Sequence, residues 1–97
     1  MAITILLSGK AKDGQMSELL SLFKEILPET RSYEGCISLD MLVDEDIEGN
    51  FTLNEVWETR DHYQTYFNWR VETGVLDKIV ALVEDPPSIN YMQITDT

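Results

Sequence analysis

The sequence predicts an α+β sandwich with the element order βαββαβ, in which helices cover one face of a four-stranded antiparallel sheet and the second helix is split. Three observations lead to this prediction. Four segments alternate apolar and polar residues as strands do, two segments place apolar residues three and four positions apart, and glycine, proline or acidic residues separate them. The 97 residues suffice for one modest core without a linker or repeat, so we expect a single domain over residues 1–97.

The first strand and the first helix follow from the N-terminal third of the chain. Residues 2–10 alternate, with apolar side chains at odd positions on one face. Asp13 is the expected N-cap of the helix that follows. The apolar stripe of that helix consists of Met16, Leu19, Leu20, Phe23, Ile26 and Leu27. Pro28 cannot donate a backbone hydrogen bond, so we expect it to kink or end the helix.

A hairpin is predicted in the middle of the chain. Gly35 opens a second strand, whose expected helix-covered face consists of Ile37, Leu39, Met41 and Val43. The acidic segment DEDIEG, residues 44–49, is interpreted as a solvated loop rather than a calcium loop, because it lacks a distant bidentate glutamate. The chain then returns through a third strand over residues 51–57.

The second helical region begins near Arg60 and is expected to break at Gly74. Its last part, GVLDKIVALVED, has one apolar side formed by Val75, Leu76, Ile79, Val80 and Val83. The sequence DPP ends the helix, and SINYMQIT forms the last strand. One face of that strand carries Ile89 and Tyr91, and the other carries Asn90, Met92 and Ile94. Helices on one face of such a sheet give the ferredoxin-like architecture.

The opposite face of the expected sheet is not cleanly polar. It offers the apolar residues Leu6, Cys36, Leu42, Val56, Met92 and Ile94. Antiparallel sheets that face water alternate more strictly, and large exposed apolar patches are uncommon on monomers. We therefore expect a homodimer in which a second sheet covers this face.

The composition excludes several classes of protein. A net charge of −11 should repel nucleic acid phosphates and anionic lipids, and no apolar run approaches the length of a membrane span. The N-terminal segment lacks the basic start and cleavage site of a secretory leader. The single cysteine, Cys36, allows no internal disulfide, which favours a cytoplasmic location. No second histidine or cysteine stands at the spacing of a metal site.

Residues 54–70, NEVWETRDHYQTYFNWR, contain both tryptophans, two tyrosines, a phenylalanine and the only histidine. On a helix, an arc of about 160° carries His62, Tyr63, Tyr66, Phe67, Trp69 and Arg70. An ordinary apolar core would be rich in Leu, Ile and Val, whereas this arc carries hydroxyl, indole, imidazole and guanidinium groups that need partners when buried. We interpret the segment as core at its ends and as the wall of a pocket at its centre.

Glu55 and Trp57 share one face of the third strand, so Glu55 is a carboxylate in apolar surroundings if that face meets the helices. Burial would then raise its pKa unless Arg70 or a hydroxyl compensates. Two interpretations of Glu55 and Arg70 stay open: a structural buried pair, or a functional pair directed at an anionic ligand. His62, near the helix start, is either a surface or capping residue or a catalytic base.

The order of these elements, together with three short motifs and an aromatic-rich helix, resembles the antibiotic biosynthesis monooxygenase superfamily of small dimeric ferredoxin-like proteins. EGC at residues 34–36 opens the second strand, and NEVW at residues 54–57 ends the third strand with a Glu-x-Trp pattern. An aromatic-rich helix follows, and PPSINY at residues 86–91 closes the domain. The resemblance covers nearly the whole chain in order and length.

The resemblance implies a homodimer whose sheets pack face to face as a dimeric α+β barrel, with a pocket between each sheet and its helices. Trp57 matches the family tryptophan beside that pocket. Asn54 resembles an asparagine that anthrone oxygenases place near this tryptophan, although the spacing differs by one residue. Members of the family oxygenate quinols or polyketide anthrones without metal or flavin, degrade haem, or isomerise a small sugar-derived signal.

The chain departs from the family pattern in its helix and its second strand. An ungapped comparison from Trp57 puts Tyr66 where a histidine is common in the family. Phe67 lies in the region where haem-degrading members hold iron with a histidine, and His62 is one turn too early. Leu39 replaces a tyrosine that is frequent three positions after the cysteine. These departures argue against haem chemistry and weaken an anthrone-type assignment.

The leading functional hypothesis is a cofactor-independent monooxygenase acting with O2 on a small aromatic, quinol-like or polyketide-like substrate. The expected catalytic residues are Trp57, Asn54, Glu55 and His62, and the expected substrate-binding residues are Tyr63, Tyr66, Trp69 and Arg70. A deprotonated quinol or anthrone reduces O2 directly, so the protein supplies binding, orientation and electrostatics, and no cofactor or metal is expected. The alternatives are a non-catalytic dimeric module that binds a hydrophobic metabolite, and a small-sugar isomerase of the same superfamily.

Overall fold

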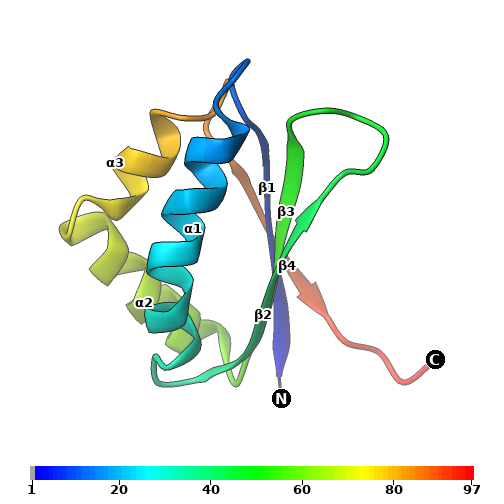
Figure 1. Ribbon diagram of the computed structural model, residues 1–97. Helices are drawn as coiled ribbons and strands as arrows, with labels where there is room; N and C mark the ends of the chain where they lie inside the picture. Colours follow the sequence, from blue (N-terminus) through cyan, green and yellow to red (C-terminus); the bar gives the residue numbers. More distant parts are fainter. Residues whose placement is uncertain (1) are drawn as a thin grey trace.

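The computed structural model describes residues 2–97 and confirms the α+β fold with the predicted order of elements. The elements are β1 (Ile3–Lys10), α1 (Met16–Arg31), β2 (Cys36–Val43), β3 (Asn50–Trp57), α2 (Arg60–Glu72), α3 (Val75–Val80) and β4 (Ser88–Gln93). The strands pair antiparallel in the order β2-β3-β1-β4. The helices all lie on one side of this sheet, and no described helix covers the other side, which we call the open face (Figure 1).

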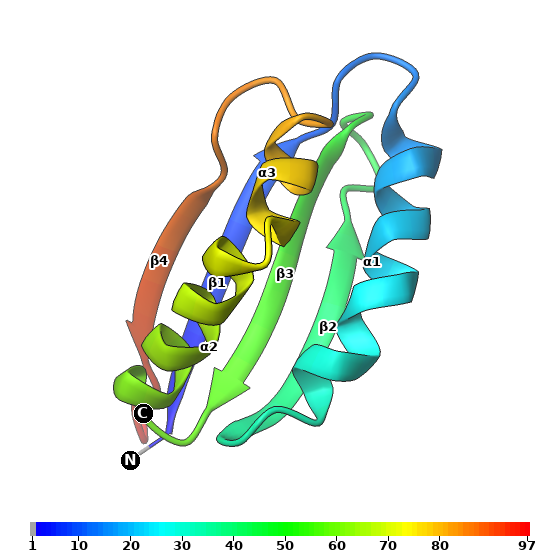
Figure 2. The same ribbon diagram turned by 90° about the vertical axis from the view of Figure 1, so that its left-hand side faces the viewer.

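The core fills the space between the sheet and the helical layer and divides into two clusters. Figure 2 shows α1 beside β2, with α2 and α3 running over the neighbouring strands. A large cluster of mainly aliphatic residues consists of Leu7, Ala11, Leu19, Phe23, Ile26, Leu27, Leu39, Phe51, Leu53, Ile79 and Val83. A second, aromatic cluster consists of Ile5, Trp57, Tyr63 and Tyr66. The aromatic cluster lies under α2, where the sequence concentrates its aromatic residues.

Helix α1 differs from the prediction at its start and on one side. It begins at Met16 with Gln15 at the N-cap position, and no side chain caps it. The expected cap, Asp13, lies in the preceding turn because the Gln15 N–H donates to the Lys12 carbonyl and closes that turn first. Leu20, predicted in the apolar stripe, is 40% exposed. Its position on the helix lies at the solvent edge of the buried stripe.

Pro28 lies inside α1 and does not end it, since the helix continues to Arg31. Proline removes one N–H donor from the helix, and here that loss falls within the last turn. The Ser32 N–H donates to the Pro28 carbonyl (3.2 Å) and closes the end of the helix.

A β-bulge between Cys36 and Ser38 changes which residues of β2 are covered. Cys36 pairs with Trp57 and packs against both core clusters, although the sequence placed it on the open face. Ile37, predicted under the helices, is 56% exposed. The bulge inserts one extra residue and so shifts the alternation for the residues before it. Beyond the bulge Leu39 is buried as predicted.

The predicted break between the second and third helices is confirmed at Gly74, whose φ of 80° is left-handed. Helix α3 ends at Val80, whereas the predicted apolar side of the helix extended to Val83. Val80 itself is 37% exposed rather than part of the buried side. Val83 is buried as predicted, but it lies outside the helix and forms an isolated β-bridge with Ala11.

The open face carries the apolar residues that the alternation predicted, with the exception of Cys36. Leu42, Met92 and Ile94 are 49%, 48% and 50% exposed, and Leu6 and Val56 are half-buried between them. Among residues 2–97, none of the helices combines the length and the apolarity that crossing a membrane requires.

Candidate functional site

Strand β3 brings two candidate functional side chains to the helix-covered face. Glu55 and Trp57 are two positions apart, so the alternation of the strand turns both toward the helices. Glu55 lies opposite Ile5 on the neighbouring strand β1 and opposite Leu39 on the other neighbouring strand, β2. The carboxyl group therefore lies in the middle of the sheet, among apolar neighbours.

Glu55 is 2% exposed, and its carboxyl Oε1 accepts a hydrogen bond from the Trp57 indole Nε1–H at 3.0 Å. Burial raises the pKa of Glu55 to about 7, because the charged form loses its hydration, and the indole hydrogen bond acts in the opposite direction. This carboxyl can thus exchange a proton near neutral pH. Such a group is typical of a general acid or base.

Trp57 is fully buried and enclosed by rings. Its ring centroid lies 5.1 Å from Tyr66, 5.6 Å from Tyr63 and 6.5 Å from Tyr33. Edge-to-face and tilted contacts of this kind stabilise the arrangement of the rings. The indole is therefore held in one orientation, with its N–H directed at Glu55. Tyr33, in the turn after α1, is a member of this group that the sequence did not single out.

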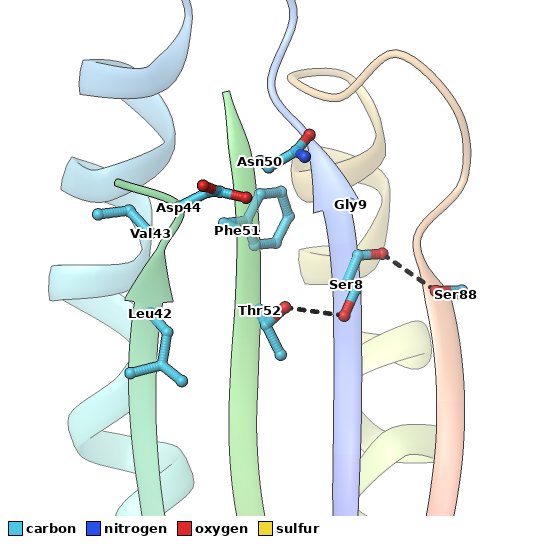
Figure 3. Close-up of a pocket in the computed structure, with 9 residues that line it drawn as sticks. All are labelled: Ser8, Gly9, Leu42, Val43, Asp44, Asn50, Phe51, Thr52 and Ser88. Atoms are coloured by element: carbon cyan, nitrogen blue, oxygen red, sulfur yellow. Dashed lines mark hydrogen bonds between the residues drawn. The ribbon is translucent and has the colours of Figure 1, made fainter. Parts of the chain in front are cut away.

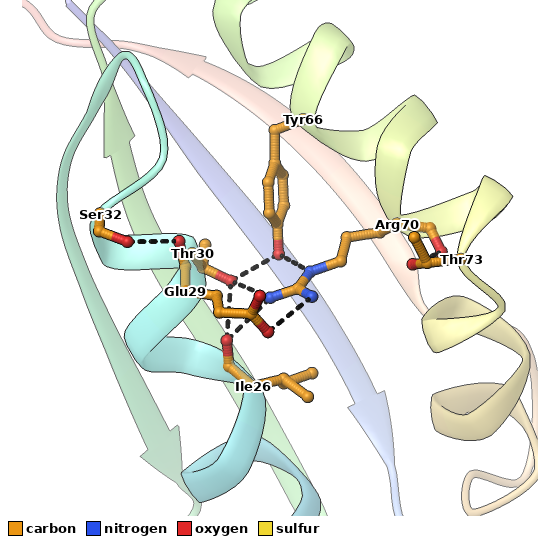
Figure 4. A network of polar contacts seen from close by, with 7 residues as sticks. All are labelled: Ile26, Glu29, Thr30, Ser32, Tyr66, Arg70 and Thr73. Atoms are coloured by element: carbon orange, nitrogen blue, oxygen red, sulfur yellow. Dashed lines mark hydrogen bonds and ion pairs between the residues drawn. The ribbon is translucent and has the colours of Figure 1, made fainter.

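Arg70 is committed to a polar network between α2 and the end of α1 (Figure 4). Its Nε donates to the Tyr66 hydroxyl (2.8 Å), and one terminal nitrogen donates to the Ile26 carbonyl (2.8 Å) and the Thr30 hydroxyl (3.0 Å). The other terminal nitrogen lies 3.7 Å from Glu29, which is exposed. The sequence left open a structural or a functional pair of Arg70 with Glu55. The structure gives Arg70 other partners, and through them Arg70 holds two helices together.

The same network restrains Tyr66 and leaves no buried polar atom without a partner. The Tyr66 and Thr30 hydroxyl oxygens are 2.6 Å apart. Burial raises the pKa of Tyr66, and its hydrogen bonds with Arg70 and Thr30 partly oppose this. Burial also raises the pKa of Tyr63, and the nearby Glu55 carboxylate adds to the effect. Both phenols therefore stay protonated and can donate hydrogen bonds. Within residues 2–97 every fully buried side-chain nitrogen or oxygen has a hydrogen-bond partner.

A small cavity of about 30 Å³ lies between the sheet and the helices and is lined by residues of both core clusters. Glu55, Tyr63, Tyr66 and Arg70 line it together with apolar residues. Those apolar residues are Leu7, Phe23, Ile26, Leu27, Leu39, Leu53, Phe67, Val75, Leu76 and Ile79. Four of the site residues expected from the sequence thus surround one interior space.

The remaining predicted site residues lie elsewhere. Asn54 alternates with Glu55 and faces the open side of the sheet, opposite Leu6 of β1 and Asp40 of β2. His62 contacts the helix N-cap: its backbone N–H donates to the Thr59 hydroxyl (3.1 Å), and its Nδ1 is 2.6 Å from the same oxygen. This is the capping arrangement, one of the two that the sequence left open. His62 does not line the interior cavity.

Trp69 lies at the outer side of the aromatic cluster. Its ring packs against Tyr33 at 5.2 Å and Tyr66 at 6.2 Å, and the Arg70 guanidinium stacks on it at 4.5 Å. It therefore covers the polar network and does not reach the cavity.

A larger and shallower hollow of about 530 Å³ lies at the end of the strands near the β2–β3 loop (Figure 3). Ser8 and Thr52 share a hydrogen bond of 2.9 Å there, and the Ser88 hydroxyl donates to the Ser8 carbonyl (3.5 Å). These hydroxyl groups bond to one another and to the backbone, and no titratable group with a raised pKa lies among the lining residues. The interior cavity, which contains the carboxyl group with the raised pKa, is therefore the candidate site. In the described part of the chain, no three His, Cys, Asp or Glu side chains are grouped to hold a metal ion.

Comparisons with known proteins agree with this architecture. The family model for antibiotic biosynthesis monooxygenase matches residues 2–70. A conserved protein from Methanosarcina mazei Go1 superposes with a TM-score of 0.89 at 18% identity, covering 98% of this chain and 94% of that one. An antibiotic biosynthesis monooxygenase gives a TM-score of 0.85 at 20% identity, covering 96% of this chain and 98% of that one.

A mutant of SnoaB, a cofactor-independent oxygenase from Streptomyces nogalater, gives a TM-score of 0.85 at 14% identity, covering 99% of this chain and 95% of that one. No curated protein sequence matches the chain. At these identities the solved structures establish the fold, and the family model establishes the family.

Proposed function

The chain belongs to the antibiotic biosynthesis monooxygenase family, and from that premise we propose that it is a cofactor-independent monooxygenase of a small aromatic, quinol-like or polyketide-like substrate. One observation carries the proposal: the Glu55 carboxyl, with a pKa raised to about 7, is buried beside an interior cavity with phenolic walls. The likeness to SnoaB, itself a cofactor-independent oxygenase, supports the same class of reaction.

Glu55 acts as the general base in this proposal. It removes a proton from the acidic C–H or O–H group of the substrate, and the resulting anion is electron-rich enough to reduce O2. For a methylene substrate, the carbon gains one oxygen atom as a ketone and the second oxygen atom leaves as water. The substrate supplies all the electrons, so the balance needs no external reductant.

Tyr63 and Tyr66 are the proposed hydrogen-bond donors to the substrate anion, because their raised pKa values keep both protonated. Trp57 positions the base: its indole N–H holds one carboxylate oxygen and leaves the other for the substrate. Arg70 supports Tyr66 from behind through its Nε.

An aromatic ring needs more room than this small cavity provides. A cavity of 150 Å³ accommodates benzene in another protein, and this one is about 30 Å³. The proposal therefore includes an outward displacement of α3, which contributes Val75 and Leu76 to the cavity wall. Gly74 joins α3 to α2 in a left-handed conformation, and nothing lies within 4 Å of the position of a Cβ there. No other part of the chain therefore packs against Gly74 itself.

Oxygen uptake by metal-stripped protein with reduced quinones and anthrones tests the proposed reaction. Wild type should consume O2 faster than a protein-free blank, and Glu55→Gln should lose most of the excess because glutamine cannot accept the proton. Glu58→Gln, at an exposed position directly after β3, is the matched control and should behave as wild type. Uptake no faster than the blank would instead favour a non-catalytic module that binds a hydrophobic metabolite.

We also propose that two copies of the chain associate through their open faces as a dimeric α+β barrel. Leu42 and Met92 are about half exposed there, on opposite edges of the sheet, with Val56 between them. Val56→Lys should convert a dimer to a monomer in light scattering, because it places a charge in the apolar interface. Ile47→Lys, at a 51% exposed position in the β2–β3 loop, should leave the dimer intact. A monomeric wild type would refute the proposal.

A further inference from the structure

Two aromatic rings in contact connect the buried carboxyl group with the surface. Trp57 is 0% exposed, and its indole N–H donates to Glu55. Tyr33, in the turn between α1 and β2, meets the Trp57 ring at its edge, with the ring centroids 6.5 Å apart. Tyr33 is half-buried and lines a second surface hollow, at the start of α2. Electrons tunnel rapidly between aromatic rings this close, so charge can pass between the interior and solvent here.

Trp57 has a proton acceptor that favours its one-electron oxidation. Loss of an electron turns an indole N–H into a strong acid, so the oxidation is easier where a base holds that proton. Glu55 Oε1 lies 3.0 Å from Trp57 Nε1, and the Glu55 pKa of about 7 leaves the carboxyl ionised above neutral pH. A negative charge beside the ring also stabilises the positive charge that develops on it. Trp57 thus combines an oxidisable ring with a base for its proton.

The other tyrosine rings that contact Trp57 are poorer electron donors than Tyr33. Tyr66 lies 5.1 Å from Trp57, but the Arg70 guanidinium lies over its ring and donates to its hydroxyl. A cation beside a ring opposes the loss of an electron. Tyr63, at 5.6 Å, is buried, and burial raises the pKa of its phenol, so that its proton leaves less easily. In the described part of the chain no cation stacks on Tyr33, which borders solvent.

We propose that Trp57 and Tyr33 form a redox relay, which moves an oxidising equivalent from the buried site to the surface. The inference rests on the proposed oxygenase function for its oxidant, a peroxyl radical formed when O2 adds to a substrate radical. The relay is a separate activity, because it leaves the substrate unchanged and protects the protein. A radical that stayed on Trp57 would react with oxygen and modify the core.

Each step of the relay conserves electrons and protons. The peroxyl radical takes one electron from Trp57 and becomes a peroxide anion, while the indole proton moves to Glu55. Tyr33 then gives an electron to the Trp57 radical, which regains its proton from Glu55. The Tyr33 hydroxyl proton passes to water, and the peroxide anion takes one proton from water. A thiol in solution gives one hydrogen atom to the Tyr33 radical and restores the relay.

Laser photoionisation tests the relay without any substrate. In a Trp69→Phe background Trp57 is the only tryptophan, so a pulse absorbed by tryptophan creates the radical at one buried ring. Its transient absorption should convert into that of a tyrosyl radical, at a first-order rate independent of protein concentration. Tyr33→Phe keeps the ring and removes the oxidisable phenol, so this variant should slow the conversion at least several-fold.

Tyr91→Phe in the same background is the matched control. Tyr91 is also half-buried, but its ring contacts Tyr63 at 6.0 Å and lies under the Arg60 guanidinium at 3.7 Å. This variant should convert the radical at the rate of the background protein. An unchanged rate in Tyr33→Phe would overturn the proposal, and so would a conversion that Tyr63→Phe removes while Tyr33 is present.

The role of Glu55 has its own spectroscopic signature. The protonated and deprotonated radicals of tryptophan absorb differently, and above neutral pH the Trp57 radical should lose its proton to the carboxylate. In Glu55→Gln the amide cannot take that proton, so the protonated radical should persist several-fold longer. Deprotonation as fast as in the background protein would overturn this role.

Failure of the relay and failure of the oxygenase proposal give different results. For equal amounts of O2 consumed, mass spectrometry should find several-fold more oxidised Trp57 in Tyr33→Phe than in Tyr91→Phe. Uptake that depends on Glu55, without radical conversion through Tyr33, removes the relay and keeps the oxygenase. Radical conversion through Tyr33 in a protein that consumes no O2 with any quinol or anthrone removes the oxygenase, and with it the proposed source of the oxidant.

Discussion

Replacing Glu55 with glutamine should change how the stability of the protein depends on pH. The pKa of Glu55 is about 7 in the folded protein against an ordinary value of 4.5, and burial is the main cause. Below pH 4.5 the side chain is protonated in both the folded and unfolded states, so burial of its charge costs nothing. As the pH rises toward 7, the unfolded state ionises while the folded state still holds the proton, and the protein loses stability.

The size of this effect follows from the two pKa values. Each pKa unit corresponds to about 1.4 kcal/mol. When the pH rises from well below 4.5 to well above 7, Glu55 alone therefore lowers the free energy of unfolding by about 3 kcal/mol. Between pH 5 and pH 8 the expected loss is about 2–3 kcal/mol. Glutamine keeps an oxygen that accepts the Trp57 N–H, and it has no charge to bury, so Glu55→Gln lacks this loss.

Urea titrations of wild type and Glu55→Gln at pH 5 and pH 8 measure the difference. The other carboxylates and the net charge of −11 affect both proteins alike, so the comparison isolates Glu55. Wild type should lose about 2–3 kcal/mol more than the variant between the two pH values. Exposed Glu58→Gln should retain the wild-type dependence. If wild type and Glu55→Gln lose the same amount of stability, the carboxyl is not buried as a charge, and its assignment as the base fails with it.

Three further substitutions test other parts of the argument. Trp57→Phe removes the hydrogen bond to the Glu55 carboxylate. Since such bonds contribute about 1.5–3 kcal/mol, the pKa of Glu55 should rise by a further 1–2 units or so in a carboxyl ¹³C titration; an unaltered titration would contradict the positioning role. Thr30→Val removes the hydroxyl that joins α1 to Arg70 on α2 and should cost about 1–3 kcal/mol in urea unfolding. Gly35→Ala forces a side chain to φ 92° against a histidine ring and should cost about 1–2 kcal/mol in thermal unfolding; an unshifted melting temperature would show that the turn relaxes.

The polar groups of the site differ in what they contribute. The Arg70 network joins α2 to α1 through hydrogen bonds to Thr30 and to the Ile26 carbonyl, 40 and 44 residues away in sequence. It therefore stabilises the helical layer. Glu55 works against stability at neutral pH, because its burial is compensated by a single indole hydrogen bond. A destabilising group at the centre of an otherwise satisfied core is typical of a functional residue.

Local patterns in the sequence determined the fold and much of the site. Strand alternation, the helical stripes and the break at Gly74 depend on neighbouring residues, so they could be predicted one segment at a time. The same alternation placed Glu55 beside Trp57, because residues two apart in a strand share a face. The aromatic arc of α2 predicted the burial of Tyr63, Tyr66 and Arg70 for a similar reason.

Only the tertiary structure decided which groups form hydrogen bonds with Arg70 and how large the cavity beside Glu55 is. Arg70 binds Thr30 and the Ile26 carbonyl, 40 and 44 residues away, and no local pattern encodes such a pairing. The bulge in β2 exchanged the environments of Cys36 and Ile37, because one inserted residue reverses the alternation before it. The volume beside Glu55 is set by side chains from both helical segments and the sheet packing together, so only the folded protein defines it.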